Sequence, residues 1–427
     1  MDETLYRAYV AILEEELIPA MGCTEPIAVA YCAAQARSAL GCQPEQVEVH
    51  ASANIIKNVK SVIVPNTGGQ RGIAAAAAAG IVANRPDAEL QVLAELDSQQ
   101  IDEIKQLLEQ VPFTVNRSEN GYIFDIQVRL TGGGHTSFAQ ISGFHTNLVH
   151  LEQDGEVLLH QDYTESADSS ATDRSLLNVE QIVNFADCLN VDDVREVLDR
   201  QISYNRAIAE EGLRGDYGAN IGSILLKSYG NSVHNRAKAY AAAGSDGRMN
   251  GCELPVVINS GSGNQGLTAS LPVIIYAEEL KVSQDLLYRA LAISNLVTIH
   301  LKTGIGRLSA YCGATSAGCG AGAGIMYLYG GHYRDIAHTI VNAIAIDSGM
   351  ICDGAKASCA AKIASAVEAG LLGMQMQMHE SQFYGGDGIV VKGVENTIRN
   401  VGTLASVGMR ETDHTIIQIM TGSPSTK

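Results

Sequence analysis

The hydrophobic pattern of residues 1–45 predicts two helices. Apolar residues recur at helical spacing across residues 3–17, and this amphipathic segment ends near Pro19. A second, alanine-rich segment is expected to have Thr24 as its N-cap and to end before Gly41. We expect both helices to pack onto the helical domain that lies later in the chain.

Residues 46–163 alternate between strand-like and helical runs. The predicted strands are VEVHAS, NIIKNVKSVIVPNT, LQVLAEL, PFTVNR, GYIFDIQVRL, HTSFAQISGFHTNLVHLEQ and EVLLHQD. Two predicted helices, GGQRGIAAAAAAGIVA and SQQIDEIKQLLEQ, lie among them, and SENG and EQDG are turn signals. This order predicts a compact α/β domain with helices on one side of a mixed or antiparallel sheet.

Residues 164–427 are predicted to be mostly helical. They begin with TESADSSATDRS, a polar, serine-rich segment that is typical of a linker. The helical segments that follow are NVEQIVNFADCL, VDDVREVLDRQISYNRAIAEEGL, GANIGSILLKSYG, HNRAKAYAAAGSDGRM, LTASLPVIIYAEEL, SQDLLYRALAISNLVTIHLK, RDIAHTIVNAIAID, AKIASAVEAGLLGMQMQM and VENTIRNVGTLASVGM. The predicted fold class is therefore α+β, a mostly α-helical domain with a smaller α/β domain.

The charge balance narrows the range of partners. The formal net charge is −18, from 29 basic and 47 acidic residues. Binding to nucleic acid or to an anionic membrane surface would need basic patches, so we expect neither partner. Small-molecule chemistry stays open, and the sequence does not decide whether the chain forms a homo-oligomer.

The N-terminus and the longest uncharged stretch bear on the compartment. The first residues are acidic and amphipathic and lack the basic region of a signal peptide, so we expect a cytoplasmic protein whose cysteines are thiols or ligands. Residues 308–333 contain no Asp, Glu, Lys or Arg. They are rich in glycine and poor in Leu, Ile and Val, which favours a closely packed buried helix over a membrane span.

The same region holds four cysteines in a setting of Gly, Ala and Ser: Cys312, Cys319, Cys352 and Cys359. Cysteines supply soft ligands and small neighbours let an inorganic group approach, so the stretch is a candidate metal or iron–sulfur site. Thirty-nine residues separate the first from the third and six separate the last two. This is neither a ferredoxin nor a zinc-finger spacing, and small buried residues explain it equally well.

Helix geometry adds a condition to the metal interpretation. In one continuous helix, Cys352 and Cys359 would lie about 10.5 Å apart along the axis, too far apart for one small cluster. If both are ligands, we therefore predict a turn at residues 353–356, where Gly354 can break the helix.

Cys23 is a second candidate for chemistry. It lies just before a predicted helix N-terminus, where the helix dipole and free N–H groups favour a thiolate. The alternative is that Cys23 is a small buried hydrophobe. Cys32, in the middle of an alanine-rich helix, is interpreted as a core residue.

The segment PVVINSGSGNQGLTASLPVI predicts an anion site. A strand-like run meets a glycine-rich loop, and a helix then begins. It matches neither the Walker A nor the GxGxxG pattern. The polar side chains of Asn259, Ser262, Asn264 and Gln265 suit a small amino or hydroxy acid, whereas the alternative is a plain glycine-rich turn.

Weaker candidates lie in the α/β domain. Lys57, Asn58, Asn66 and Thr67 lie near a predicted strand end, and His135 lies in the loop GGGHTS. Such single polar residues are more often solvated or satisfied than functional. The segment GGDGIVVKG near the C-terminus could be a hairpin or a closing loop, and we assign it no chemistry.

Four of these motifs together carry a resemblance. MGCTEP, NSGSGNQG, SAYCG and CDGAKASC occur in the order seen in the L-cysteine desulfidase family, and the resemblance covers essentially the whole chain. That family is a branch of the iron–sulfur L-serine dehydratase alpha-chain superfamily. The resemblance implies that Cys312, Cys352 and Cys359 hold a [4Fe–4S] cluster through three irons. The fourth iron is then open to substrate, and Cys319 is not a ligand.

The resemblance also implies roles for residues elsewhere in the chain. Cys23 matches the family's reactive N-terminal cysteine, the catalytic base or a removable ligand of the fourth iron. GCTEP stands where the dehydratases have a Ser-Ser-His-Thr-type segment, and SGSGNQG replaces their Pro-Thr-Asn-Gly-type loop. No pyridoxal phosphate is implied. The residues expected to bind substrate are Asn259, Ser262, Asn264, Lys57, Asn58 and Thr67.

These observations predict a carbon–sulfur lyase. The expected reaction is β-elimination of L-cysteine to pyruvate, ammonia and hydrogensulfide, with the open iron as Lewis acid and Cys23 as general base. Three alternatives stay open: L-serine dehydration with the same cluster, a non-catalytic cluster-based sensor of amino acids or redox state, and a zinc-bound structural protein.

Overall fold

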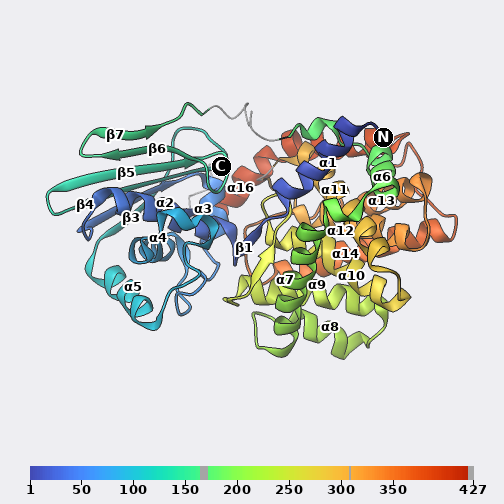
Figure 1. Cartoon of the computed structure of the whole chain (residues 1–427), viewed down its shortest axis with the longest axis horizontal. Coiled ribbons are helices and arrows are strands. Elements are labelled where there is room, and N and C mark those ends of the chain that lie inside the picture. Colours follow the sequence, from blue (N-terminus) through green and yellow to red (C-terminus); the bar gives the residue numbers. More distant parts are fainter. Residues whose placement is uncertain (164–171, 307–308, 422–427) are drawn as a thin grey trace.

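Six strands form one twisted sheet in the N-terminal part of the molecule (Figure 1). The computed structural model describes residues 1–163, 172–306 and 309–421. The strands are β2 (Gln46–Ala51), β3 (Phe113–Arg117), β4 (Asp125–Gly132), β5 (His135–Ser142), β6 (Leu148–Gln153) and β7 (Glu156–His160). Their order is β3-β2-β4-β5-β6-β7. Only β2 and β3 run parallel, so the predicted mixed sheet and the α+β class are confirmed.

Helices cover one face of this sheet. They are α2 (Thr24–Leu40), α4 (Gly72–Ala83) and, outside α4, α5 (Ser98–Gln110). Small residues let α2 and α4 pack closely, because a Cβ added to Gly80 would lie 1.9 Å from the carbonyl oxygen of Ala30. Cys32 is a fully buried residue of α2, and its thiol donates to the Ala139 carbonyl of β5.

Two predicted strands of this part are wrong. Residues 54–65 begin as the helix α3 (Ala53–Val59), in which Ile55 and Val59 are buried one turn apart. Residues 90–96 begin within a 3-10 helix (Pro86–Gln91), which packs against α2. Both are short apolar runs, for which hydrophobic periodicity does not separate strand from buried helix or turn.

The first two helices separate, although both were predicted to pack on the helical part. Only α1 (Glu3–Glu16) lies there, where the rings of Tyr6 and Tyr9 are 5.2 and 5.5 Å from that of Phe185. The next helix, α2, instead covers the sheet because it is buried along most of its surface. Its N-cap is Cys23, one residue before the predicted Thr24.

The helical part follows the predicted order. Its helices are α6 (Val179–Cys188), α7 (Arg195–Arg214), α8 (Ile221–Tyr229), α9 (Val233–Met249), α10 (Gly263–Leu280), α11 (Gln284–Ile305), α12 (Gly313–Leu328), α13 (Tyr333–Asp347), α14 (Cys359–Met378), α15 (Val394–Thr403), a π turn (Leu404–Gly408) and α16 (Arg410–Thr421). Most of the predicted linker, residues 164–171, lies outside the described residues.

The glycine-rich helix α12 lies at the centre of the helical part. It packs against α10, α11, α13 and α14. A Cβ at Gly318 would lie 2.2 Å from the carbonyl oxygen of Ala366 on α14, so the small residues allow backbone contact. No helix within the described part of the chain is both long and apolar enough to cross a membrane.

Two elements join the sheet part to the helical part. The short strand β1 (Pro19–Met21) pairs antiparallel with β8 (Pro255–Val257), which lies just before α10. The C-terminal helix α16, which the sequence analysis did not predict, lies between the two parts and packs against α3 (Figure 1). The start of α2, the loop after β8 and α3 therefore meet at this junction.

Candidate active site

Four cysteines from distant parts of the sequence line one cavity of about 110 Å³. They are Cys23, Cys312, Cys352 and Cys359. All nine cysteines are free. The fold thus brings the N-terminal Cys23 to the three cysteines that the family resemblance marks as cluster ligands.

The backbone holds Cys312 and Cys352 side by side. The Cys312 N–H donates to the Met350 carbonyl at 3.0 Å, and the Cys352 N–H donates to the Ala310 carbonyl at 2.6 Å. Cys312 is the N-cap of α12. This pairing of two segments is a contact that no local sequence pattern encodes.

The chain turns between Cys352 and Cys359, as the sequence predicted for two ligands of one cluster. No helix forms between them, and α14 begins at Cys359. Gly354 has a φ of +95°, and a Cβ there would lie 2.3 Å from the carbonyl oxygen of Lys57. Glycine therefore permits both the turn and its close contact with α3.

Cys319 lies away from the cavity. It is buried in α12 among the core residues of the helical part and does not line the cavity wall. Its position fits a packing role.

The three cysteines that line the cavity are candidate ligands of an iron–sulfur cluster. Among the described residues, no three His, Cys, Asp or Glu side chains form a group that could hold one metal ion. A [4Fe–4S] cluster makes a different demand, because each iron takes its own cysteine thiolate and the ligands surround the group. Three free thiols around one cavity meet this demand, and Gly313, Gly354, Ala314 and Ala355 leave room at the wall.

The electrostatics of the cavity also fit an anionic group. Burial, and next the thiol of Cys352, raise the pKa of the Cys312 thiol to about 12. The thiols can therefore ionise together only beside compensating positive charge, which a bound metal supplies. Lys57, Arg248, Lys302 and Lys362 line the cavity. The N-termini of α2, α10, α12 and α14 meet there as well, and each favours negative charge.

The cavity lining also includes a buried carboxylate that the sequence analysis missed. Glu25 lines the cavity and accepts hydrogen bonds from the Cys23 thiol at 3.1 Å and from the Asn58 amide at 2.8 Å. Burial alone would raise the pKa of the Glu25 carboxyl, but His145, the bond from Cys23 and Arg248 together lower it. The environment of Glu25 therefore favours a buried anion beside the Cys23 thiol.

The surroundings of Cys23 oppose the thiolate that its helix N-terminal position favours. Burial, and next the charge of Glu25, raise the pKa of the Cys23 thiol well above its usual value. Cys23 caps α2 as expected, yet the neighbouring carboxylate and burial outweigh the helix dipole. The Cys23 thiol donates to a Glu25 carboxylate oxygen at 3.1 Å.

The glycine-rich loop after β8 supplies polar atoms to the cavity. Ser262, Asn264 and Gln265 line it, and Arg248 donates to the Asn264 side-chain oxygen at 3.1 Å. Three buried atoms have no hydrogen-bond partner among the described residues: Arg248 Nε, Gln265 Oε1 and Asn58 Oδ1. Such atoms are costly to bury unless a ligand completes them.

The cavity does not include Asn259, which was expected in substrate binding. Its side-chain amide is fully buried and donates to the Asn295 side-chain oxygen at 2.9 Å. It therefore anchors the loop to α11.

Of the candidate residues in the α/β domain, some line the cavity and others do not. Lys57 and Asn58 line the cavity, and the Lys57 ammonium pairs with the Asp413 carboxylate at 2.5 Å. Thr67 does not line it, since its hydroxyl donates to the Val64 carbonyl. Asn66 donates to the Leu93 carbonyl, and the exposed His135 at the start of β5 pairs with Asp154 of the β6–β7 turn.

Comparison with known proteins defines the class to which this site belongs. Residues 87–418 match the family model described as "Serine dehydratase alpha chain". The chain belongs to this family, and so to the iron–sulfur serine dehydratase-like superfamily.

Close relatives cover the whole length. A "UPF0597 protein" from Desulfitobacterium hafniense is 58% identical over 97% of this chain and 96% of its own. Another from Lachnoclostridium phytofermentans is 49% identical over 97% of this chain and 100% of its own. A third from Fusobacterium nucleatum is 44% identical over 98% and 100%. The N-terminal residues outside the family match, including Cys23 and Glu25, thus lie within full-length similarity.

Proposed function

We propose that this protein is a cytoplasmic L-cysteine desulfidase that converts L-cysteine to pyruvate, ammonia and hydrogensulfide by β-elimination with a [4Fe–4S] cluster. The observation that carries the proposal is the composition of one cavity. Three thiols suited to a cluster form one wall, and a thiol–carboxylate pair, Cys23 and Glu25, forms another.

In this proposal Cys312, Cys352 and Cys359 hold the cluster, which when bound supplies a Lewis-acidic iron open to substrate. The side chains around it bind the charged ends of the amino acid. Arg248, whose Nε lacks a partner among the described residues, suits the substrate carboxylate. The unpaired oxygens of Gln265 and Asn58 suit the ammonium.

Cys23 and Glu25 together move the proton. The thiol proton passes to the Glu25 oxygen 3.1 Å away, and the thiolate so formed takes the α-proton of the substrate. The Asn58 amide donates a hydrogen bond to the other carboxylate oxygen of Glu25 and holds this side chain in place. Hydrogensulfide leaves, and the aminoacrylate tautomerises and is hydrolysed to pyruvate and ammonia.

The surroundings of Cys23 favour a sulfur leaving group. Cys23 packs in a small apolar cluster with Val62 and Met249, against Ala355 and Cys359. A thiol is tolerated among apolar side chains and sulfur, whereas a buried hydroxyl needs a hydrogen-bond partner. L-serine dehydration is the second candidate, because the family model describes a serine dehydratase chain.

The test is pyruvate formation by anaerobically reconstituted protein, with L-cysteine and L-serine assayed in parallel. We expect kcat/KM for L-cysteine to exceed that for L-serine by at least about tenfold. A preference for L-serine would make the protein a dehydratase. Pyruvate from neither substrate, in protein whose iron and acid-labile sulfide are intact, would favour a sensor and reject the proposed reaction.

A further inference from the structure

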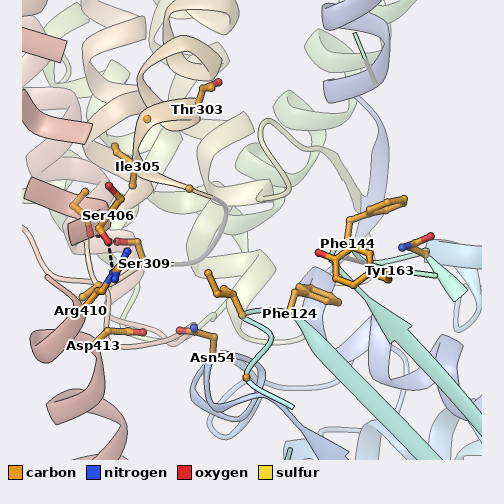
Figure 2. Close-up of a pocket in the computed structure, with 18 of the residues that line it drawn as sticks. Asn54, Phe124, Phe144, Tyr163, Thr303, Ile305, Ser309, Ser406, Arg410 and Asp413 are labelled. Carbon is orange, nitrogen blue, oxygen red and sulfur yellow. Dashed lines mark hydrogen bonds between the residues drawn. The ribbon is translucent and has the colours of Figure 1, made fainter. Parts of the chain in front are cut away.

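A second cavity of about 1030 Å³ lies between the sheet part and the helical part, beside the catalytic cavity (Figure 2). Phe124, Phe144 and Tyr163 gather on its sheet side. The opposite side is formed by the end of α11, the π turn and the first turn of α16. No function stated so far uses this space.

Two features connect the cavities. Ser309 lines both of them. The Lys57–Asp413 ion pair separates them, because Lys57 lines the catalytic cavity and Asp413 lines the larger one. A molecule in the larger cavity would therefore lie against the partition in front of the catalytic residues.

The polar atoms near this partition complement an amino-acid zwitterion. Asn54 on α3 is 9% exposed, and its Oδ1 has no hydrogen-bond partner among the described residues. Asn54 and Asp413 point toward one another across the cavity (Figure 2). Two facing acceptors suit an ammonium group, which supplies three donors.

The matching cation is one turn away. Arg410 lies three residues before Asp413 on α16, so both side chains line the same wall, with Cβ atoms about 5–6 Å apart. The Arg410 Nε donates to the Ser406 carbonyl at 3.0 Å, which orients the guanidinium. The first turn of a helix also favours an anion, so a carboxylate is suited here.

We propose that the larger cavity is an entry site that binds a small L-α-amino acid as a zwitterion before it passes the Lys57–Asp413 partition. Arg410 takes the carboxylate, and Asn54 with Asp413 takes the ammonium. The role as an entry site depends on the proposed function, whereas the binding itself does not.

The kinetic test uses the anaerobically reconstituted enzyme and the variant Arg410→Gln. We expect kcat/KM for L-cysteine to fall by about tenfold while kcat changes little, because entry is impaired and the chemistry is not. The matched control is Arg399→Gln, an exposed arginine on α15 that pairs with Asn396 and does not line the cavity. Equal effects in both variants would contradict the proposal.

The binding test needs no turnover. Ser406→Cys places a thiol on the cavity wall, and exposed Cys188 on α6 serves as an internal reference. Labelling of both thiols is followed by mass spectrometry with L-alanine, which is a zwitterion without a leaving group. We expect L-alanine to slow labelling at position 406 severalfold but not at Cys188, and propionate or ethylamine to protect less.

The two tests separate the proposals. Protection by L-alanine that is lost in Ser406→Cys/Arg410→Gln supports the site even if no pyruvate forms. Normal turnover with no protection and no effect of Arg410→Gln would overturn the entry site and leave the desulfidase proposal intact.

Discussion

The two walls of the candidate active-site cavity, one with Cys312, Cys352 and Cys359 and the other with Cys23 and Glu25, are built differently. On the C-terminal wall the thiols have weak partners, such as the 3.7 Å contact from Cys359 to the Gly354 carbonyl. On the N-terminal wall the Cys23 thiol is part of a network with Glu25 and Asn58. Thiols without strong hydrogen bonds are free to ligate, and a thiol bonded to a carboxylate is prepared for proton transfer.

Two carboxylates, one near each wall, show the same contrast. Although burial opposes it, Glu25 has a lowered pKa because His145, Cys23 and Arg248 favour its anion. Asp347, behind the cysteine wall, has a pKa raised to about 6 by burial, with a single hydrogen bond from Thr315 opposing the shift. The carboxyl pKa is thus lowered on one side of the site and raised on the other.

The largest expected effect comes from removing a proposed ligand. Cys352→Ala should lose the brown colour and acid-labile sulfide and reduce turnover by at least about a thousandfold, because the proposed cluster would supply the Lewis acid. The measurements are iron and sulfide content and pyruvate formation. Cys319→Ala, which removes a cysteine outside the cavity, should keep both. A fully coloured and active Cys352→Ala enzyme would refute the ligand assignment.

An intermediate effect is expected on the other wall. Glu25→Gln keeps the shape but removes the group that accepts the Cys23 proton, so kcat should fall by roughly 10²- to 10⁴-fold. Iron content should remain unchanged, which separates this variant from a ligand variant. Cys23→Ser should show the same pattern. If Glu25→Gln loses its iron instead, the two walls are not functionally distinct.

The sequence was sufficient to predict the sheet, the order of most helices and the turn between Cys352 and Cys359. These features follow from local period and from glycine. It was not sufficient for α3, whose short apolar run is buried like a strand. It also did not predict α16, whose role depends on a contact with α3 far away in the chain.

The sequence also predicted only part of the candidate site. Spacing alone did not distinguish metal ligands from packing residues, and the proposed ligand roles of Cys312, Cys352 and Cys359 come from the family resemblance. Glu25 has a sequence signal, since an acidic residue in the first turn suits the helix dipole. That signal is ordinary on an exposed helix. Glu25 is a candidate for proton transfer because it is buried beside Cys23, and the sequence alone does not show this contact.

The smallest expected effect tests the contrast between the two carboxylates. The pKa of Asp347 is about 6 in the folded chain and near 3.8 when unfolded. The folded state therefore holds this proton more tightly, and the resulting stability is present below pH 4 and lost as pH rises through 6. Asn cannot ionise, so the Asp347→Asn variant does not lose this stability as the pH rises. It should raise the free energy of unfolding at pH 7.5 by about 1 kcal/mol, discounted for partial exposure, and change it little at pH 4. Denaturant unfolding at the two pH values, with exposed Asp285→Asn as control, measures the difference. A gain that is equal at both pH values would mean that packing, and not ionisation, explains the effect of Asp347.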